Sequence, residues 1–161
     1  MIDYNNIGQY RENNRIEAKK ATGGLPESIW ETYSAFANAE GGVILLGVEE
    51  LPDHSLRPID LPHAEDLVWE FWQRVNDQKT ASANILSQED VEIILADGCR
   101  IIAVRVPKAA DEDRPVYIYG DAMSGSYVRN GEGDYRIPPE EIQKMLQKSA
   151  EIRKEKESCE S

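Results

Sequence analysis

The chain has 161 residues, and its 30 acidic side chains outnumber 18 basic ones, which gives a formal net charge of −12. This length fits one domain with one hydrophobic core, since domains commonly hold about 100–150 residues. The negative charge disfavours nucleic-acid binding, because an acidic surface repels a polyanion. With no bilayer-length apolar run and no signal-peptide pattern, we expect a cytoplasmic protein without a membrane partner. Two cysteines, two histidines and no C-x-x-C motif predict neither a disulfide framework nor a zinc site.

The first half of the chain predicts two strands and two helices. In chain order they are a strand at 15–19, a helix at 26–40, a strand at 43–48 and, after a loop with room for a short edge strand, a helix at 63–78. Polar and apolar residues alternate in the first strand, which puts Glu17 and Lys19 on one face. The second strand is apolar on both faces and should be central in its sheet. Between helix and strand, Gly41 and Gly42 predict a helix cap rather than a phosphate loop.

The second half predicts a hairpin, two short strands and a last helix. In chain order they are paired strands at 91–96 and 99–106, strands at 114–119 and 125–131, and a helix that begins after Pro139. The hairpin is the clearest of these, because Asp97-Gly98 suits a type I′ turn. We therefore predict an α+β fold with a mixed, largely antiparallel sheet and about three amphipathic helices. The domain should cover residues 1–146, and residues 147–161 should form a polar helical tail or the start of a linker.

Four short motifs follow one another along the chain. They are Glu12…Glu17-x-Lys19, the block 34–48 with its Ala-Phe-Ala-Asn and Gly-Gly, Arg114-Pro115-Val116-Tyr117, and Tyr127-Val128-Arg129-x-Gly131. Together they resemble the Schlafen Alba-type domain over residues 8–146. That resemblance implies the DNA-binding module found at the N-terminus of bacterial transcriptional regulators. It also implies kinship with the Schlafen nuclease core, in which three carboxylates hold a divalent metal ion that cleaves RNA.

The resemblance carries over to particular carboxylates. Glu12 and Glu17 match the first two family positions, and the third falls at Glu49 or Glu50, of which we take Glu50. As a nuclease site, these three acids would bind Mg²⁺ or Mn²⁺, and Lys19 would stabilise charge on the phosphate. The family more usually has Asp at the third position. Its Ser or Thr after the Arg-x-Gly element is replaced here by an acidic segment, 132–134, which opposes an approaching phosphate.

Spacing sets a condition on this site. Glu12 and Glu17 would point to opposite faces of one strand, so they converge only if the backbone changes type between them, for which Asn13-Asn14 is suited. The alternative is that Glu17 and Lys19 form a weak surface pair.

A small basic island interrupts the acidic chain near the first strand. Its residues Arg15, Lys19 and Lys20 are predicted to contact nucleic acid. Arg129, which lies beside Tyr127 in the sequence, is a fourth predicted contact, because it could bind phosphate while the tyrosine ring stacks on a base. For that arginine, a surface ion pair is the alternative.

Three functions remain open from the sequence. The first is a DNA- or RNA-binding domain of a transcriptional regulator, which needs no cofactor. The second is a metal-dependent endoribonuclease that uses the three carboxylates. The third is a protein-interaction module, which suits the acidic surface. Monomer and homodimer are both open, and fold alone does not choose among these functions.

Overall fold

The computed structural model describes residues 2–160 and forms an α+β domain. Its strands are β1 (Ile16–Lys19), β2 (Gly42–Leu46), β3 (Val48–Glu50), β4 (Leu56–Pro58), β5 (Val91–Ala96), β6 (Cys99–Val106), β7 (Tyr127–Asn130) and β8 (Gly133–Arg136). Its helices are α1 (Ile29–Ala37), α2 (Ala64–Val75), α3 (Ala122–Gly125) and α4 (Pro139–Glu160), with short 3-10 helices η1 (Tyr4–Gln9), η2 (Gln88–Asp90) and η3 (Asp111–Asp113). Within residues 2–160, no helix is long and apolar enough to span a membrane.

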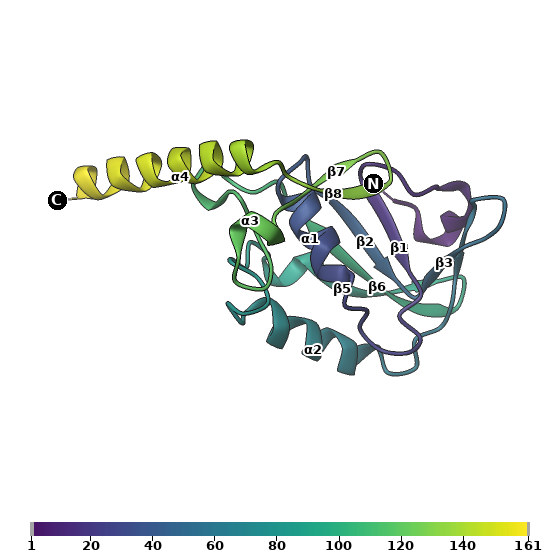
Figure 1. The fold of residues 1–161 in the computed structure, drawn as a ribbon. Helices are drawn as coiled ribbons and strands as arrows, with labels where there is room; N and C mark the ends of the chain where they lie inside the picture. The colour runs from purple at the N-terminus through teal and green to yellow at the C-terminus, as the bar shows by residue number, and fades with distance from the viewer. Residues whose placement is uncertain (1, 161) are drawn as a thin grey trace.

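The central sheet has four strands in the order β1-β2-β6-β5 (Figure 1). β1 runs parallel to β2, and the other two pairings are antiparallel. The apolar strand β2 is central, as its two-sided hydrophobicity predicts. Two-stranded ribbons, β3–β4 and β7–β8, flank this sheet. The largely antiparallel α+β prediction is confirmed.

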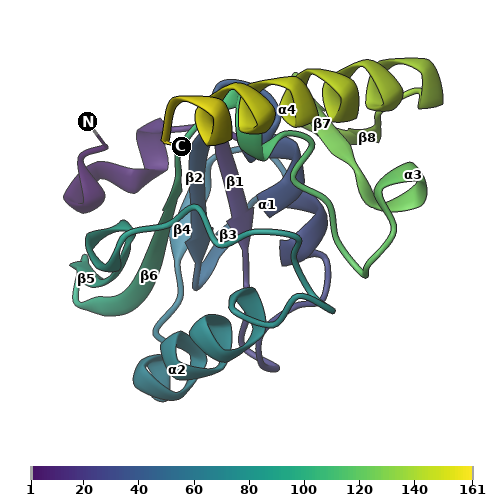
Figure 2. The same cartoon turned by 90° about the vertical axis from the view of Figure 1, so that its left-hand side faces the viewer.

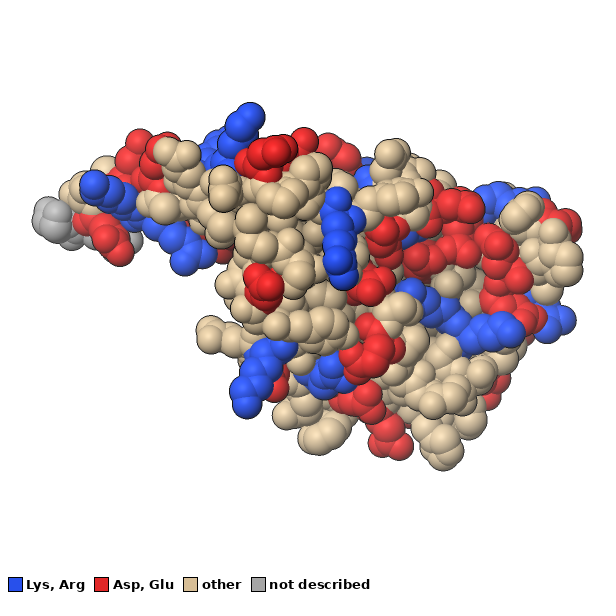
Figure 3. Space-filling model, viewed as in Figure 1, with Lys and Arg blue, Asp and Glu red and all other residues tan. Residues whose placement is uncertain are grey.

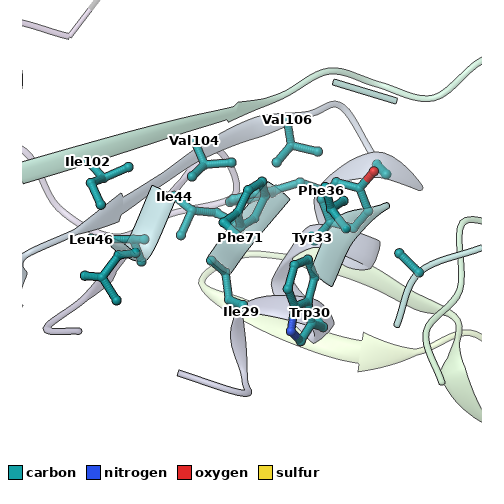
Figure 4. Packing of buried hydrophobic residues seen from close by; sticks show 14 of the residues in the cluster. Ile29, Trp30, Tyr33, Phe36, Ile44, Leu46, Phe71, Ile102, Val104 and Val106 are labelled. Atoms are coloured by element: carbon teal, nitrogen blue, oxygen red, sulfur yellow. The ribbon is translucent and has the colours of Figure 1, made fainter. Parts of the chain in front are cut away.

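Helices α1 and α2 cover one face of the sheet and bury most of the core against it (Figure 4). Their apolar stripes recur every three or four residues, so each helix turns one side toward the strands. The ring of Trp30 stacks on Phe71 with centroids 5.2 Å apart, which joins the two helices. Beneath them, Ile44 of β2 and Val104 of β6 are fully buried.

A smaller apolar cluster lies on the opposite face, where η1 and the β3–β4 ribbon pack (Figure 2). Ile7 of η1 and Leu45 of β2 are buried there. Because side chains alternate along a strand, Ile16 points into this cluster while Glu17 points to the α1 side. One strand thus supplies core on one face and polar groups on the other.

Two tight turns fix the register of the sheet. Asp97 and Gly98 have φ of 50° and 80°, as a type I′ hairpin turn requires. Gly41 has φ of 79°, and its N–H donates to the carbonyl of Phe36 at 2.9 Å, which caps α1. A Cβ atom on Gly41 would lie 2.7 Å from the carbonyl oxygen of Val106. The helix-cap prediction is therefore confirmed.

Two segments of the C-terminal third differ from the prediction. Residues 114–119 form isolated bridges rather than a strand, and the polar segment 133–136, not expected as a strand, pairs with β7 as β8. α4 continues unbroken to Glu160, and it projects from the domain (Figure 1). α4 binds η3 through Ser149, whose hydroxyl donates to the Glu112 carbonyl, and through Lys156, whose ammonium lies 2.6 Å from the Glu112 carboxylate.

Candidate functional site

A turn before β1 brings the first two predicted carboxylates onto one side of the sheet. The N–H of Asn13 donates to the carbonyl of Ile16 at 3.0 Å, and the Asn13 side chain accepts from the N–H of Arg15 at 2.7 Å. This local closure reverses the chain between Glu12 and Glu17, so the strand geometry that would separate them does not apply. The break anticipated at Asn13 is therefore present.

The third carboxylate comes from the ribbon beside β1. Glu50 ends β3, and its carboxyl interacts with that of Glu12, which also interacts with Glu17. Burial, and then these two neighbouring carboxyls, raise the pKa of Glu12 to about 9 from 4.5. At neutral pH Glu12 therefore carries a proton and can donate it to a neighbouring carboxylate. We call Glu12, Glu17 and Glu50 the carboxyl cluster.

The carboxyl cluster belongs to an acidic part of the surface. In Figure 3, acidic side chains gather where β1, β3 and the N-terminal segment meet. Glu49 adds to this part, but it is neutralised by Lys20 at 3.6 Å and by Arg57. Glu50 instead has His54 at 3.4 Å, a partner that carries charge only when protonated. Glu50, rather than Glu49, is thus the third acid that meets Glu12.

Arg129 lies under the other side of Glu17. Its side chain has 0% exposed area, and one Nη contacts Glu17 at 3.0 Å and Asp134 at 2.7 Å. The remaining donors reach the carbonyl oxygens of Asn13 and Ile16, and the guanidinium lies 4.9 Å from the ring centre of Phe36. Burial lowers the pKa of Arg129, but its hydrogen bonds to the two carboxylates outweigh burial and raise that pKa above its usual range.

The predicted phosphate contact at Arg129 is therefore wrong in this structure. No part of the guanidinium is exposed, and all of its nitrogens already have acceptors. The sequence showed an arginine beside an aromatic residue in a glycine-flanked segment, a pattern that does not reveal burial. Arg129 holds the turn at Asn13 against β7, and so it positions Glu17.

The other predicted basic residues remain at or near the surface but do not form one patch. Lys19 is half-buried and its ammonium donates to the Ser28 hydroxyl at 3.0 Å. Lys20 is exposed and pairs with Glu49. Arg15 is exposed on the opposite side of the sheet, beside Ile16. Of the four residues, Lys19 is the one that shares the face of Glu17 along β1.

Sequence reasoning missed the role of Asp134. The sequence predicts that Asp134, within the acidic segment 132–134, repels phosphate. In the structure its carboxylate instead binds Arg129 and accepts a hydrogen bond from the Thr32 hydroxyl at 2.7 Å. Arg129 and Asp134 face each other directly across β7 and β8. An opposite-charge pair at directly facing positions is favourable, and it could have been recognised if β8 had been predicted.

Two buried polar side chains of the motif at 34–48 stabilise the fold. The Asn38 side chain donates to the carbonyls of Val116 and Tyr127, both at 2.9 Å, and accepts from the N–H of Val116 at 2.8 Å. The Ser34 hydroxyl, also buried, donates to the Val116 carbonyl and accepts from the N–H of Tyr127. These bonds replace a strand ladder for the segment around Val116 and hold β7, with Arg129, over α1.

The donor chemistry of the carboxyl cluster fits a hard divalent cation such as Mg²⁺ or Mn²⁺, which prefers oxygen ligands. In this structure, however, the carboxyl groups of the cluster are placed as acids that share a proton. Among residues 2–160, no group of three or more His, Cys, Asp or Glu side chains is positioned to hold a metal ion. A cation would have to displace the proton of Glu12 and draw the three groups together.

Comparison with known proteins places this site in a family. Residues 12–138 match the family described as Schlafen, AlbA_2. The chain belongs to the Schlafen AlbA_2 family. Its structure is similar to the N-terminal domain of a RecG-related protein from Nitrosomonas europaea, at 26% identity and a TM-score of 0.62, over 85% of this chain and 94% of that one.

A weaker likeness is to the DIP2311 protein from Corynebacterium diphtheriae. The two share 17% identity with a TM-score of 0.48, over 76% of this chain and 25% of that one. No curated protein matches the sequence. The family match begins at Glu12 and includes Glu17 and Glu50, so the whole carboxyl cluster lies inside the matched domain.

Proposed function

We propose that this Schlafen AlbA_2 domain is a nucleic-acid-binding module of a transcriptional regulator, and that it contacts phosphate with the help of a divalent cation at the carboxyl cluster. The observation that carries the proposal is the convergence of Glu12, Glu17 and Glu50 from three separate segments. Membership of the family supports a role with nucleic acid. The Nitrosomonas neighbour, whose name relates it to the DNA helicase RecG, supports it further.

The sequence alone predicts a binding module that needs no cofactor, but the charges of the folded domain favour a cation requirement. The net charge is −12, and two of the predicted phosphate contacts, Lys20 and Arg129, are already paired with carboxylates. Bare phosphate approaching the carboxyl cluster would be repelled. A divalent cation bound to the carboxyl oxygens would reverse the local charge, and Lys19 would add a further positive group on the same face. This explains how an acidic domain could retain nucleic acid.

A second candidate function is metal-dependent endoribonuclease activity. It is favoured by the same three carboxyls together with Lys19, which lies two residues from Glu17 on one face of β1. A bound Mg²⁺ or Mn²⁺ would supply Lewis-acid polarisation of the phosphate. In this reaction Glu12, Glu17 and Glu50 would hold the cation, and Lys19 would orient the phosphate and offset its developing charge.

One gel experiment tests both functions. Structured RNA, single-stranded DNA and duplex DNA are each incubated with the protein in EDTA or in millimolar Mn²⁺, and retention and cleavage are measured. We expect retention that depends on Mn²⁺ and on Glu50, so that Glu50→Gln abolishes it. Glu70→Gln on the exposed face of α2 removes the same charge elsewhere and should change nothing.

Glu50→Gln is a cleaner test than Glu17→Gln, because Glu17 also neutralises the buried Arg129. Retention without cleavage supports the binding module, and cleavage lost in Glu50→Gln supports the nuclease. If neither retention nor cleavage responds to Mn²⁺, the proposal fails and the protein-interaction module is favoured.

A further inference from the structure

A cavity of about 540 Å³ lies on the face of the sheet opposite the carboxyl cluster. The N-terminal segment forms one wall, and the first residues of β1 and β2 and the last of β6 form the floor. Ile16 lines this cavity, whereas its neighbour Glu17 points to the other face of β1. The volume is within the range of about 300–1,000 Å³ typical of small-molecule sites. The cavity is therefore separate from the proposed metal site.

The cavity combines an apolar floor with aromatic walls. Ile16 and Val43 provide aliphatic surface, and Tyr4 and Tyr10 provide two phenol rings. Tyr10 is held in place because its hydroxyl accepts from the N–H of Asp3 at 2.9 Å. A flat, partly apolar ring such as a nucleobase would be well accommodated between such surfaces, because aromatic side chains can stack on the face of any base.

Two arginines and one aspartate line the cavity, and they differ in whether their charge is already paired. Arg105 is fixed by the Glu89 carbonyl at 3.0 Å and the Glu92 carboxylate at 2.6 Å. Arg15 is exposed, and no carboxylate of the described residues pairs with its guanidinium. The one lining acid, Asp90, accepts from the N–H and hydroxyl of Ser87 at 2.8 and 3.1 Å. Arg15 is thus the group left to bind an anion.

We propose that this cavity binds a phosphorylated nucleoside, either a free mononucleotide or the end of a single strand. The base would lie between the tyrosines and the aliphatic floor, and the phosphate would be bound by Arg15. An arginine suits this role because its planar donors match phosphate oxygens in pairs. The proposal uses neither the carboxyl cluster nor a cation, so it stands independently of the proposed function.

Binding of adenosine monophosphate in EDTA tests the site. Titration calorimetry gives the affinity, and amide NMR shifts at Gly42 and Val43 locate the ligand on the cavity floor. We expect adenosine monophosphate to bind more tightly than adenosine or inorganic phosphate. Arg15→Ala should weaken its binding at least about tenfold, since a hydrogen-bonded charge contributes on that scale. Glu50→Gln should bind as the wild type does, which separates this site from the carboxyl cluster.

Arg136→Ala is the matched control, because it removes an exposed arginine from β8. Oligonucleotides with a 5′-phosphate or a 5′-hydroxyl then separate the two sources, since preference for the phosphorylated end indicates a strand terminus. Equal weakening by Arg136→Ala, or calorimetric binding without shifts at Gly42 and Val43, would overturn the proposal. Shifts caused by an acidic peptide but not by adenosine monophosphate would overturn it in favour of a protein partner.

Discussion

The Glu17 carboxylate has a buried cation on one side and further carboxyl groups on the other. On one side Arg129 is fully buried and holds Glu17 and Asp134 together, with each of its nitrogens bonded to an acceptor. On the other side lie Glu12 and Glu50, and burial of Glu12, together with the neighbouring carboxyls, raises its pKa to about 9, so that it keeps its proton at neutral pH. In the first arrangement Arg129 neutralises the carboxylates, whereas in the second only a bound proton or cation can do so. A buried ion pair and a ligand site can therefore share one side chain.

The largest effect is expected where the buried arginine is removed. Arg129→Met leaves Glu17 and Asp134 without their common partner and releases the turn at Asn13. Breaking a buried pair on one side commonly costs about 3–5 kcal/mol, so urea unfolding should show a loss of that size. The same change at exposed Arg136 should alter the free energy of unfolding by less than about 0.5 kcal/mol. Equal small losses in both variants would contradict the structural role of Arg129.

A cation should stabilise the other side of Glu17. A ligand bound only by the folded state at 100 times its dissociation constant adds about 2.7 kcal/mol, so millimolar Mn²⁺ should raise the Tm measurably if it binds tightly. Thermal unfolding with increasing Mn²⁺ measures this. Glu50→Gln should abolish the rise, and Glu70→Gln should keep it. A flat curve for the wild-type protein would exclude a cation at the carboxyl cluster.

The proton on Glu12 makes a prediction with a definite sign. Its folded-state pKa of about 9 exceeds the unfolded value of 4.5, so the folded state binds the proton more tightly. The stabilisation is complete below pH 4.5 and is lost as the pH rises through 9. Glu12→Gln keeps a neutral group and should avoid this loss.

We therefore expect Glu12→Gln to be more stable than the wild type at pH 8, by about 1–2 kcal/mol after allowance for solvent screening of a half-buried group. Below pH 4.5 the difference should disappear. Urea unfolding of both proteins between pH 4 and 9 measures it. A difference that does not change with pH would show that Glu12 is ionised in the folded state.

The smallest effect is expected at Lys20, an exposed side chain whose ammonium lies 3.6 Å from the Glu49 carboxylate, which Arg57 also binds. Exposed ion pairs contribute about 0–1 kcal/mol, because water and salt screen them. Lys20→Ala should therefore change the free energy of unfolding by less than about 1 kcal/mol, and added salt should reduce the change. A loss comparable with that of Arg129→Met would show that burial does not separate the two kinds of ion pair.

The sequence by itself determined the elements whose signals are local. The hairpin follows from Asp97-Gly98, the central strand from its two apolar faces, and the end of α1 from Gly41 with its positive φ. Each depends on neighbouring residues or on simple periodicity, so it can be predicted without the rest of the molecule. The meeting of Glu12 and Glu17 was predictable in the same way, from the break at Asn13-Asn14.

Only the tertiary structure decided how distant polar groups pair. Arg129 lies 112 positions from Glu17, and its burial depends on β8, a polar strand with no apolar alternation to reveal it. The segment around Val116 takes its hydrogen bonds from Asn38 rather than from a strand, a contact across 78 positions. Such partners are chosen by three-dimensional packing, because a charge is buried only where other segments supply every acceptor it needs.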